Sequence, residues 1–443
     1  MRRLAHALVF CTAFVSLVAA AFDKPAFPRL GGYKIGNPKA YETEALQADL
    51  AKLDLVVISA GPGWEAGHRA NLEDVIRAIK KSNPHVVIVT YVNVNERVSN
   101  ASGAWKEAID TVEREKWWLY PQGTSGAPVA STWGGNYITN YSLAGQTNGK
   151  GEKYVDWFAK WIYQQIISDA PSLDGAFTDN FFWKPRVDGD WDRDGAIDYK
   201  DSPKAQTLHR QGMRRHIENL RGLMPGKYQL GNVGDWGNKN ATYPEYKGLL
   251  NGGVLEHYIG DSWSPEGQDW KGAINSGGSW NELMRRYRAV MGDLAEPKLL
   301  IFNQFGDPHD YQSFRYGLTS CLMDNGYYDF SDATRDAYGS VPWFDEYGAD
   351  LGNATSEPPT VAWKSGVFRR DFENGIALVN PRGNGSVTVD LEKDFIHISG
   401  TQDRAVNNGQ TTRRITLKDR DGIILLDPNA NNLPRPPRSF RAE

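Results

Sequence analysis

The sequence predicts an α/β fold, in which a (β/α)8 barrel of the TIM type precedes a smaller C-terminal antiparallel β-sandwich. Two observations favour this fold. Up to about residue 350, short continuous apolar runs alternate with longer amphipathic stretches. From about residue 354 the chain changes to short alternating segments separated by Asn, Gly, Asp and Pro. The length of 443 residues agrees with two domains, because single cores stop growing at about 250 to 300 residues.

Composition and charge narrow the class of protein. Hydrophobic residues at 40% and charged residues at 23% are ordinary for a globular chain, which excludes disordered and coiled-coil proteins. The net charge is −4 and there is no basic run, so we expect no nucleic-acid partner. The 15 Trp residues indicate either a large core or flat apolar platforms for sugar rings.

Residues 1–21 have the order of a secretory signal peptide. Arg2 and Arg3 precede an apolar run that ends at Leu17, and small residues follow from Ala19 to Ala21. We therefore expect this segment to be removed and the mature protein to be secreted or periplasmic. No later segment approaches the ~20 apolar residues that a membrane span needs, so no membrane span is expected.

Eight apolar runs are predicted as the strands of the barrel, which occupies residues 22–350. Each run is too continuous for a strand with one exposed face and too short for a helix. The runs are Arg29–Ile35, Leu53–Ala60, His85–Val94, Leu173–Phe181, Tyr228–Val233, Gly253–Ile259, Lys298–Phe305 and Tyr327–Phe330. A doubly wound sheet would also alternate strands with helices, but no GxGxxG turn follows the first run.

Seven amphipathic stretches between these runs are predicted as helices. They are Tyr41–Lys52, Asn71–Lys81, Trp105–Trp118, Lys153–Ser168, Ala205–Leu223, Trp280–Asp293 and Tyr311–Asp324. Seven crossovers joining eight strands is the count of a (β/α)8 barrel.

The second domain is predicted over residues 354–428. Its segments of alternating hydrophobicity are Thr360–Arg369, Gly375–Val379, Ser386–Leu391, Arg413–Leu417 and Gly422–Leu426. Residues 429–443 are rich in Asn, Pro and Arg, and we expect a loose tail there.

Carboxylates and amides dominate the carboxyl ends of the predicted strands, where barrel enzymes place their active sites. Asp179 ends the fourth strand, and Glu256 lies at or near the end of the sixth. Alternate strands contribute side chains to one layer, so these two carboxyl groups can point into one pocket. Glycoside hydrolysis needs such a pair, one group to protonate the leaving oxygen and one to act as nucleophile or to activate water. Asp235 is a reserve candidate, and the alternative is that either acid binds loop backbone or an Arg.

Other residues near strand ends and in loops are candidates for substrate binding. They are Trp64, Asn95, Glu96, Trp133, Asn140, Asn180, Trp183, Trp236, Trp263 and Gln304. Asn140 belongs to a long insertion, Tyr120–Lys150, for which an ordinary surface loop is the alternative. Trp residues within helical patterns are better explained by core packing.

The segment from Asp190 to Asp201 reads DWDRDGAIDYKD, which is typical of a twelve-residue calcium loop. Acids occupy positions 1, 3, 5, 9 and 12, and Gly195 at position 6 permits the sharp turn. The predicted Ca²⁺ ligands are Asp190, Asp192, Asp194, the carbonyl of Ala196, Asp198 and Asp201. Because the loop follows the fourth strand, the ion would order the wall beside Asp179. An acidic solvated turn is the alternative.

Four segments resemble a known family. They are Gly175–Asn180, Arg315–Phe330, Ala377–Pro381 and Asp421–Leu426. Together they are similar to glycoside hydrolases that join a barrel to a C-terminal β-sandwich, with a more distant likeness to secreted endo-α-1,4-polygalactosaminidase-type barrels. The resemblance implies polysaccharide hydrolysis with an Asp on strand four, and Asp179 matches that position.

Two functions follow from these patterns. The first is a secreted glycoside hydrolase that cleaves a polysaccharide or oligosaccharide with Asp179 and Glu256. The second is a catalytically silent carbohydrate-binding or cell-surface protein that keeps the barrel, the calcium loop and the Trp platforms. The sequence alone leaves both open, because it does not show whether the two acids face one another.

Overall fold

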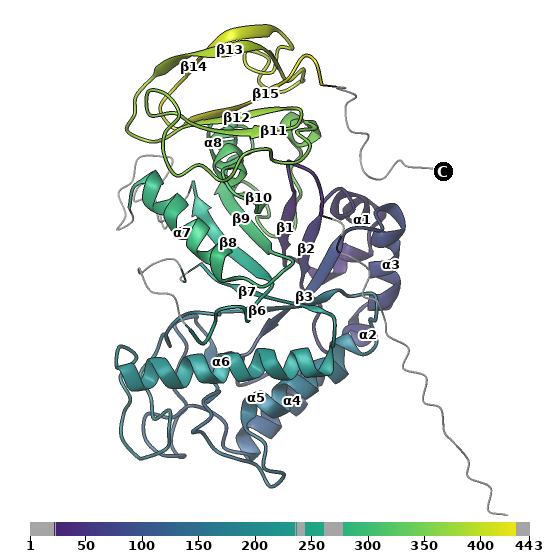
Figure 1. The fold of residues 1–443 in the computed structure, drawn as a ribbon. Helices are drawn as coiled ribbons and strands as arrows, with labels where there is room; N and C mark the ends of the chain where they lie inside the picture. The colour runs from purple at the N-terminus through teal and green to yellow at the C-terminus, as the bar shows by residue number, and fades with distance from the viewer. Residues whose placement is uncertain (1–21, 23, 235, 237–243, 261–277, 431–443) are drawn as a thin grey trace, which may run out of the picture.

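The computed structural model describes residues 22, 24–234, 236, 244–260 and 278–430 (Figure 1). Eight parallel strands form one sheet in the order β1-β2-β3-β6-β7-β8-β9-β10. The strands are β1 Gly31–Lys34, β2 Leu55–Ile58, β3 Val87–Asn93, β6 Gly175–Asp179, β7 Tyr228–Asn232, β8 Gly252–Ile259, β9 Leu299–Gly306 and β10 Tyr327–Asp332. Each lies within or overlaps one predicted run, which confirms the parallel barrel. The predicted signal peptide and residues 431–443 of the predicted tail lie outside the described residues.

The sheet is a nearly closed barrel whose two edge strands, β1 and β10, meet at a short contact. Leu30 forms a parallel bridge with Tyr328, and the Tyr328 N–H donates to the Arg29 carbonyl at 2.8 Å. At the end of β1, the buried Lys34 ammonium pairs with the carboxylate of Asp329 in β10 at 2.8 Å. Backbone pairing and this buried ion pair together hold the two edges of the sheet.

Both faces of the barrel strands are buried. The lumen is filled by one residue or two from each strand, among them Tyr33, Val57, Val89 and Phe177. The alternate residues, such as Val56 and Ile88, pack outward in a cluster that includes the surrounding helices. This double burial explains why the sequence shows continuous apolar runs and no period of two.

The seven predicted helices are present, with one more that was not predicted, α2. They are α1 Glu44–Leu50, α2 Trp64–Gly67, α3 Leu72–Ser82, α4 Ala104–Arg114, α5 Tyr154–Ile162, α6 Pro203–Leu223, α7 Trp280–Asp293 and α8 Tyr311–Leu322. A π-helix, Tyr163–Ile167, extends α5, and 3-10 helices span Pro38–Glu42 and Asp345–Gly348. Helix starts follow ordinary capping chemistry: the Asn71 side chain, for example, accepts the Asp74 N–H at 2.8 Å.

The helices are not distributed as one per crossover. Both α4 and α5 lie between β3 and β6, whereas the described residues between β7 and β8 contain no α-helix. An unpredicted two-stranded antiparallel sheet, β4 Glu96–Val98 with β5 Asn136–Ile138, lies in the β3 to β6 connection. This long connection therefore builds one wall above the carboxyl ends of the strands.

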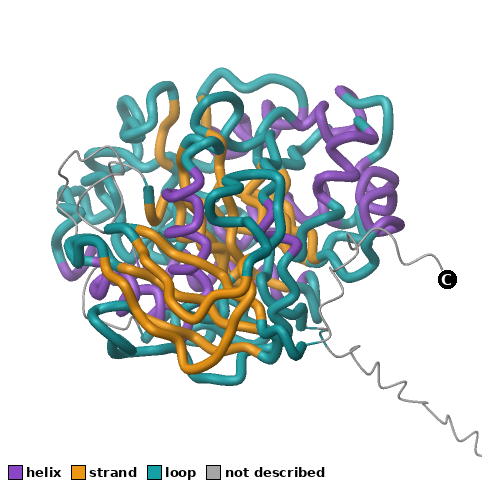
Figure 2. The backbone as a smooth tube through the Cα atoms, turned by 90° about the horizontal axis from the view of Figure 1, so that it is seen from above, coloured by secondary structure: helices purple, strands orange, loops and turns teal. Residues whose placement is uncertain are grey.

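The C-terminal region is antiparallel, as predicted. Its strands are β11 Phe368–Phe372, β12 Gly375–Asn380, β13 Val387–His397, β14 Thr411–Leu417 and β15 Asp421–Leu426, in the order β11-β12-β15-β13-β14. They form one five-stranded sheet in which β13 and β14 arch over the other three strands (Figure 1). Residues of β12 to β15, including Ile376, Val389 and Leu417, share a core of their own, whereas Phe368 and Phe372 of β11 belong to the barrel cluster. Figure 2 shows these strands from above, in orange, lying next to one another.

Helix α8 joins the two domains, since every residue from Ser313 to Leu322 is buried. A Cβ added at Gly422 of β15 would lie 1.9 Å from the Thr319 hydroxyl, so the strand passes directly over the helix. Arg315 of α8 pairs with Asp421 at 3.3 Å and with Asp403. Among the described residues, no helix has the length and apolar character that crossing a membrane requires.

Candidate active site

Asp179 is the last residue of β6, at the carboxyl end of the barrel. The next residue, Asn180, has a positive φ of 54°, so the chain turns sharply away as the strand ends. The Asp179 carboxylate accepts a hydrogen bond from the Tyr91 hydroxyl of β3 at 2.5 Å. It accepts another from the Asn232 amide of β7 at 3.1 Å. Both neighbouring strands therefore hold this carboxylate in place.

Glu256 lies in an irregular part of β8. The register with β9 shifts between Leu255 and Ile259, and His257 has a positive φ of 47°. The His257 N–H donates to the Asn303 side-chain oxygen at 2.9 Å, which anchors the bulge to β9. Bulges commonly redirect side chains at functional sites, and this bulge carries Glu256 at the carboxyl end of the barrel.

A buried network supports that bulge from inside the barrel. The Asn303 amide donates to the Asp329 carboxylate at 2.7 Å, and Asp329 is the partner of Lys34. The Tyr33 N–H donates to the same carboxylate at 3.0 Å. Asn303 therefore links the bulge in β8 to the buried ion pair of Lys34 and Asp329.

One amide joins the two carboxylates predicted as catalytic. The Asn232 Nδ2 donates to Asp179 Oδ1 at 3.1 Å and to Glu256 Oε2 at 2.8 Å. Those two oxygens are consequently no more than about 5.9 Å apart. The other oxygen of Glu256 accepts the Tyr338 hydroxyl at 2.7 Å, from the segment that follows β10. We call Asp179, Glu256, Asn232, Tyr91 and Tyr338 the carboxylate site.

The surroundings of Asp179 favour a proton on its carboxyl group. Burial raises the pKa of Asp179 to about 6, and the nearby charge of Glu256 acts in the same direction. The hydrogen bonds from Tyr91 and Asn232 oppose this shift but do not cancel it. Burial and the Asp179 charge raise the pKa of the Tyr91 phenol far above its ordinary value, so Tyr91 acts only as a donor.

Two of the predicted substrate-binding residues, Asn180 and Glu96, are hydrogen-bonded to each other next to Asp179. Asn180 donates from its amide to Glu96 Oε1 at 3.0 Å, and the other Glu96 oxygen accepts the Ser131 hydroxyl at 2.6 Å. Asn95 is buried next to Glu96. Glu96 therefore ties the end of β6 to the β4–β5 wall of the site.

The tryptophans predicted as sugar platforms occupy different environments. Trp64 is buried and stacks on His68 with ring centroids 3.6 Å apart. Trp236 is buried against Tyr246, with its indole N–H bonded to the Phe181 carbonyl at 2.8 Å. Trp133 is 52% exposed and Trp183 is partly exposed, so these two present accessible rings. Trp64 and Trp236 therefore pack in the core and present no accessible ring to a sugar.

Gln304 and Asn140 are buried and point away from the two carboxylates. The Gln304 amide donates to Ser313 of α8 at 3.0 Å, and its oxygen accepts the Tyr328 hydroxyl at 2.5 Å. The Asn140 amide donates to the Trp191 carbonyl at 3.2 Å and thereby holds the acidic loop. Asp235 and Trp263 lie outside the described residues.

Sequence reasoning missed three members of the carboxylate site, Asn232, Tyr91 and Tyr338. Tyr91 lies inside an apolar run, and Tyr338 is 82 residues from the carboxylate it contacts. Asn232 is the last residue of β7, and the strand-end rule would have found it had the fifth run been ended one residue earlier.

The acidic loop brings part of the predicted metal set together. Asp190, Asp192 and Asp194 each place a carboxylate oxygen within 4.8 Å of the others, so these three residues could hold a metal ion. Asp190 is fully buried and accepts the Gly123 and Gly195 N–H groups at 2.7 and 2.9 Å. The loop is therefore already folded around its first acid.

Lysine side chains form ion pairs with the predicted acidic ligands of this loop other than Asp190. The Lys204 ammonium of α6 lies 2.7 Å from Asp192, 3.1 Å from Asp194 and 2.8 Å from Asp198. Asp201 pairs with Lys184. The Ala196 N–H donates to Asp194 at 2.8 Å. Asp198 and Asp201 thus lie outside the group of three, and a metal ion would compete with the Lys204 charge.

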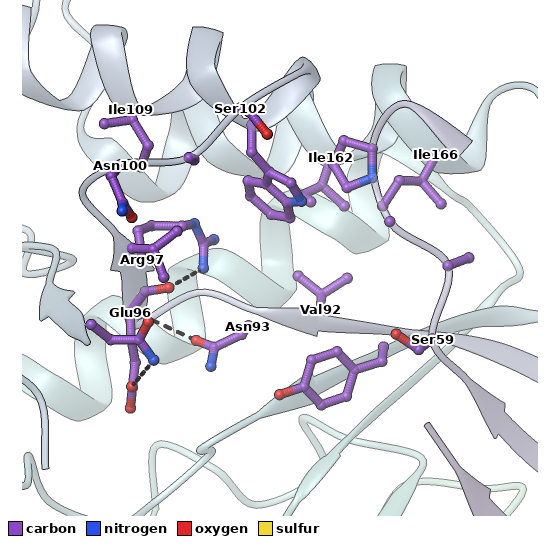
Figure 3. Close-up of a pocket in the computed structure, with 18 residues that line it drawn as sticks. Ser59, Val92, Asn93, Glu96, Arg97, Asn100, Ser102, Ile109, Ile162 and Ile166 are labelled. Atoms are coloured by element: carbon purple, nitrogen blue, oxygen red, sulfur yellow. Dashed lines mark hydrogen bonds between the residues drawn. The ribbon is translucent and has the colours of Figure 1, made fainter. Parts of the chain in front are cut away.

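A cavity of about 480 Å³ opens beside the carboxylate site (Figure 3). It is lined by the end of β2, by Tyr91 and Asn93 of β3, by Arg97 of β4, and by Trp105 of α4. Tyr91 is shared, since its ring lines the cavity while its hydroxyl bonds Asp179. The cavity therefore adjoins the predicted catalytic acid.

A parallel barrel with two carboxylates held close together at the carboxyl ends of its strands is the arrangement that glycoside hydrolases use. Comparison with protein families agrees. The model of hypothetical glycosyl hydrolase family 15 matches residues 80–376. The match covers more than half of the chain, which therefore belongs to this family. The chain is a glycoside hydrolase with a carbohydrate substrate, and the predicted family resemblance is confirmed.

Solved structures similar to this chain include other glycoside-acting enzymes. The glycoside hydrolase domain of PelA from Pseudomonas aeruginosa is 13% identical, with 72% of this chain and 98% of that chain covered and a TM-score of 0.41. Eubacterium rectale Amy13B is 10% identical, with coverages of 89% and 92% and a TM-score of 0.49. For the GH36 α-galactosidase AgaA from Geobacillus stearothermophilus these values are 11%, 92%, 56% and 0.44. No curated protein matches the chain.

Proposed function

We propose that the protein is a secreted hydrolase of a polysaccharide and that Asp179 and Glu256 are its catalytic pair. The observation that carries this proposal is the Asn232 amide, which donates to both carboxylates at 3.1 and 2.8 Å. Two carboxyl groups so close together suit a single glycosidic bond between them. The long wall built by β4, β5 and the exposed Trp133 suits an extended chain of sugars better than a single sugar.

The spacing favours a retaining mechanism. Retaining enzymes hold their carboxyl groups about 5 to 5.5 Å apart, whereas inverting enzymes need about 6.5 to 9.5 Å to admit a water. An upper limit of about 5.9 Å between the facing oxygens falls on the retaining side. In this mechanism one carboxylate attacks the anomeric carbon, and the other group protonates the leaving oxygen and later activates water.

We assign the acid and base role to Asp179 and the nucleophilic role to Glu256. Asp179 carries its proton to higher pH because burial raises its pKa to about 6. The Asn232 and Tyr338 hydrogen bonds leave Glu256 as a fixed acceptor pointing toward the same site. Tyr91 donates to Asp179 and orients its carboxyl group.

The test is turnover on a panel of polysaccharides by the mature chain and three variants. Asp179→Asn and Glu256→Gln should each lower kcat at least about a thousandfold, because each removes one half of a two-step mechanism. Asp174→Asn is the matched control, since Asp174 immediately precedes the same barrel strand at its opposite end and pairs with Lys80 at 2.7 Å. Undiminished turnover in either of the first two variants would exclude the pair. Glycan binding without cleavage by the unmodified chain would favour a catalytically silent carbohydrate-binding protein.

The secretion part of the proposal rests on residues 1–21, with their Arg2–Arg3 start, apolar run and small residues at Ala19–Ala21. The intact mass of protein recovered from outside the cytoplasm should correspond to a chain that starts close to residue 21 or 22. Recovery of the uncleaved chain from the cytoplasm alone would contradict secretion.

We also propose that Asp190, Asp192 and Asp194 hold a Ca²⁺ ion in a structural role. Hard oxygen ligands and a Gly at position 6 of the loop suit calcium. Calcium should raise the melting temperature and a chelator should lower it, because binding to the folded state alone stabilises that state. Lys204→Met should tighten calcium binding by removing the competing charge. A melting temperature that is indifferent to calcium in both proteins would contradict the proposal.

A further inference from the structure

The cavity beside the carboxylate site lies on the far side of Asp179 from Glu256. Its lining comes from the ends of β2 and β3, from β4, from α4, and from α5 with its π-helical extension. In the barrel, β3 is the neighbour on one side of β6, the strand that carries Asp179. On the other side of β6 come β7 and then β8, which carries Glu256. Tyr91 of β3 joins the cavity to Asp179, because its ring lines the cavity and its hydroxyl donates to the carboxylate at 2.5 Å.

Several polar groups of the cavity lining form no hydrogen bonds to the part of the chain that the structure describes. They are the side chains of Ser59, Asn100 and Ser102 and the indole N–H of Trp105. The N–H of the neighbouring Trp161 is buried, whereas that of Trp105 is accessible. These groups are therefore available to the hydroxyl groups of a ligand, which both donate and accept hydrogen bonds.

Gly61 keeps a space open in front of the Trp105 indole. A Cβ added at Gly61 would lie 4.0 Å from the Trp105 Nε1, its only described contact within 4 Å apart from its chain neighbours. The backbone of Gly61 does not have a positive φ, so its conformation does not require glycine. A larger residue at this position would therefore fill the space before the indole N–H without straining the backbone.

One wall of the cavity is apolar. Ile109 of α4, with Ile162 and Ile166 of the α5 segment, lies on the side opposite Ser59 and Asn93 (Figure 3). The cavity volume of about 480 Å³ is within the usual range of small-ligand pockets, about 300 to 1,000 Å³. A pyranose ring has hydroxyl groups at its edge and C–H groups on its faces, so it matches a cavity with one polar and one apolar side.

The charges of the lining favour an uncharged ligand. Glu96 and Arg97 are the charged residues among those that line the cavity, and their charges have opposite signs. Both side chains are buried. The oxygens of Glu96 already accept hydrogen bonds from Asn180, Ser131 and Asn136. An acidic sugar would be repelled by the Glu96 carboxylate, and a basic sugar would find its oxygens already occupied.

We propose that this cavity binds an uncharged sugar unit of the leaving group, next to the bond that is cut. The general acid protonates the oxygen of the leaving group, so the space beyond Asp179 receives the sugar that departs. The hydroxyl groups of that sugar bond the Trp105 N–H and the Ser59 hydroxyl, and its faces lie against the isoleucine wall. The inference rests on the proposed function and deepens it, because it names the kind of leaving group that the site accepts.

Isothermal titration calorimetry on the full mature chain carrying Glu256→Gln tests whether the cavity binds a sugar. The probes are tetrasaccharides of glucose, galactose, mannose and xylose, with tetramers of galacturonate and of glucosamine as charged comparisons. We expect at least one neutral tetrasaccharide to bind more tightly than both charged tetramers. Gly61→Leu should weaken its binding at least about tenfold by filling the space before the indole. Trp105→Phe should weaken it about two- to tenfold, because one neutral hydrogen bond is lost.

Gly67→Leu is the matched control. Gly67 is an exposed residue of α2 outside the cavity lining, and no described atom lies within 4 Å of a Cβ added there, so this variant should bind as the parent does. A melting curve reports whether Gly61→Leu folds, and Trp105→Phe decides the test if it does not. The proposal is overturned if no neutral tetrasaccharide binds, if a folded Gly61→Leu or Trp105→Phe variant keeps the parent affinity, or if a charged tetramer binds most tightly.

A comparison of two substrates tests the placement on the leaving-group side. One is the neutral oligosaccharide that the enzyme cleaves, and the other is the glycosyl fluoride of the same sugar and anomeric configuration, whose leaving group is a single ion. Gly61→Leu should lower kcat/KM for the oligosaccharide at least about tenfold and keep kcat/KM for the fluoride within about twofold. Equal losses on the two substrates would overturn the placement.

Failure of this inference is distinguishable from failure of the proposed function. If the unmodified chain cleaves no glycan but tetrasaccharide binding depends on Gly61 and Trp105, the proposed function fails and the sugar site stands. If Asp179→Asn and Glu256→Gln abolish turnover but neither binding nor kcat/KM responds to Gly61→Leu and Trp105→Phe, the catalytic pair stands and the cavity inference fails.

Discussion

At the scale of single residues, the side-chain amide of Asn232 is the link between the two carboxyl groups, because it donates a hydrogen bond to each of them. Asn232 holds Asp179 and Glu256 together without adding charge, so two acids stay close with little freedom to separate. The adjacent negative charge and burial both favour a proton on Asp179. The arrangement therefore places a carboxyl group that favours its proton beside a second carboxyl group held by hydrogen bonds from Asn232 and Tyr338.

The raised pKa of Asp179 predicts that activity depends on pH. The pKa of Asp179 is raised to about 6, so the general acid is lost as pH rises through that value. We expect kcat/KM to fall above about pH 6, with an alkaline limb that disappears in the residual activity of Asp179→Asn. A pH profile that is flat from pH 5 to pH 8 would contradict the assignment.

The raised pKa of Asp179 also makes the free energy of unfolding depend on pH. The dependence is opposite to that of a salt-bridged acid, whose lowered pKa makes the folded state more stable as the pH rises. The folded state binds this proton more tightly than the unfolded state, so the contribution of Asp179 to stability is lost between about pH 4 and pH 6. Asp179→Asn should therefore be more stable than the unmodified chain at pH 7, by about 1 to 2 kcal/mol once partial exposure is allowed for. Denaturant unfolding at pH 4 and pH 7 measures the difference, and an equal or lower stability at pH 7 would contradict it.

At the scale of elements, the bulge in β8 is the feature that delivers Glu256. Asn303 of β9 holds the bulge, and Asp329 and Lys34 hold Asn303 from the strands that close the barrel. Strand closure and active-site geometry are thus coupled through one buried network.

The network predicts that Lys34→Met is strongly destabilising. It would leave the Asp329 charge buried without its ionic partner, and such a loss is worth about 3 to 5 kcal/mol. Lys52→Met is the matched control, because the Lys52 and Asp49 side chains are 33% and 40% exposed and such pairs contribute at most about 1 kcal/mol. Urea unfolding compares the two, and a similar loss in both variants would contradict the account.

Elements differ in how well the sequence predicts them, and the reason is physical. The eight barrel strands are buried on both faces, so their apolar runs are visible without any knowledge of their partners. The two-stranded sheet of β4 and β5 has only three residues in each strand, and its pairing joins residues far apart in the sequence. The β8 bulge carries no local signal, because a register shift exists only relative to a neighbouring strand.

The candidate site divides in the same way. Asp179 follows from the rule that active sites lie at strand ends, because that rule uses only the strand and its direction. Tyr91 and Tyr338 reach the site through barrel closure, which no spacing along the chain reveals. The loop positions of Trp64 and Trp236 predict platforms, but the structure buries both rings against other aromatic side chains, which the sequence does not reveal.

At the scale of the whole molecule, the barrel and the C-terminal sheet share helix α8. The helix is buried on all sides, and Arg315 connects it to Asp421 of the sheet. Removing either domain would expose apolar surface on the other, so the two should unfold together.

Shared burial predicts one cooperative transition that responds to a change at the domain interface. A methyl group at Gly422 would meet the Thr319 hydroxyl at 1.9 Å, so Gly422→Ala should destabilise the molecule by about 1 to 3 kcal/mol. Gly222→Ala in α6 is the matched control, because no atom lies within 4 Å of its added methyl group. Calorimetry should show the entire transition of Gly422→Ala moving to lower temperature. Two separate transitions, with only one displaced, would contradict the shared core.

We infer that Asp179 and Glu256, held close by Asn232, cleave a glycosidic bond by double displacement. Proton NMR of the first product released from a cleaved polysaccharide tests it most directly, because it reports the anomer before mutarotation. The spacing of at most about 5.9 Å predicts that the new reducing end keeps the configuration of the bond that was cut. Release of the opposite anomer would contradict the account.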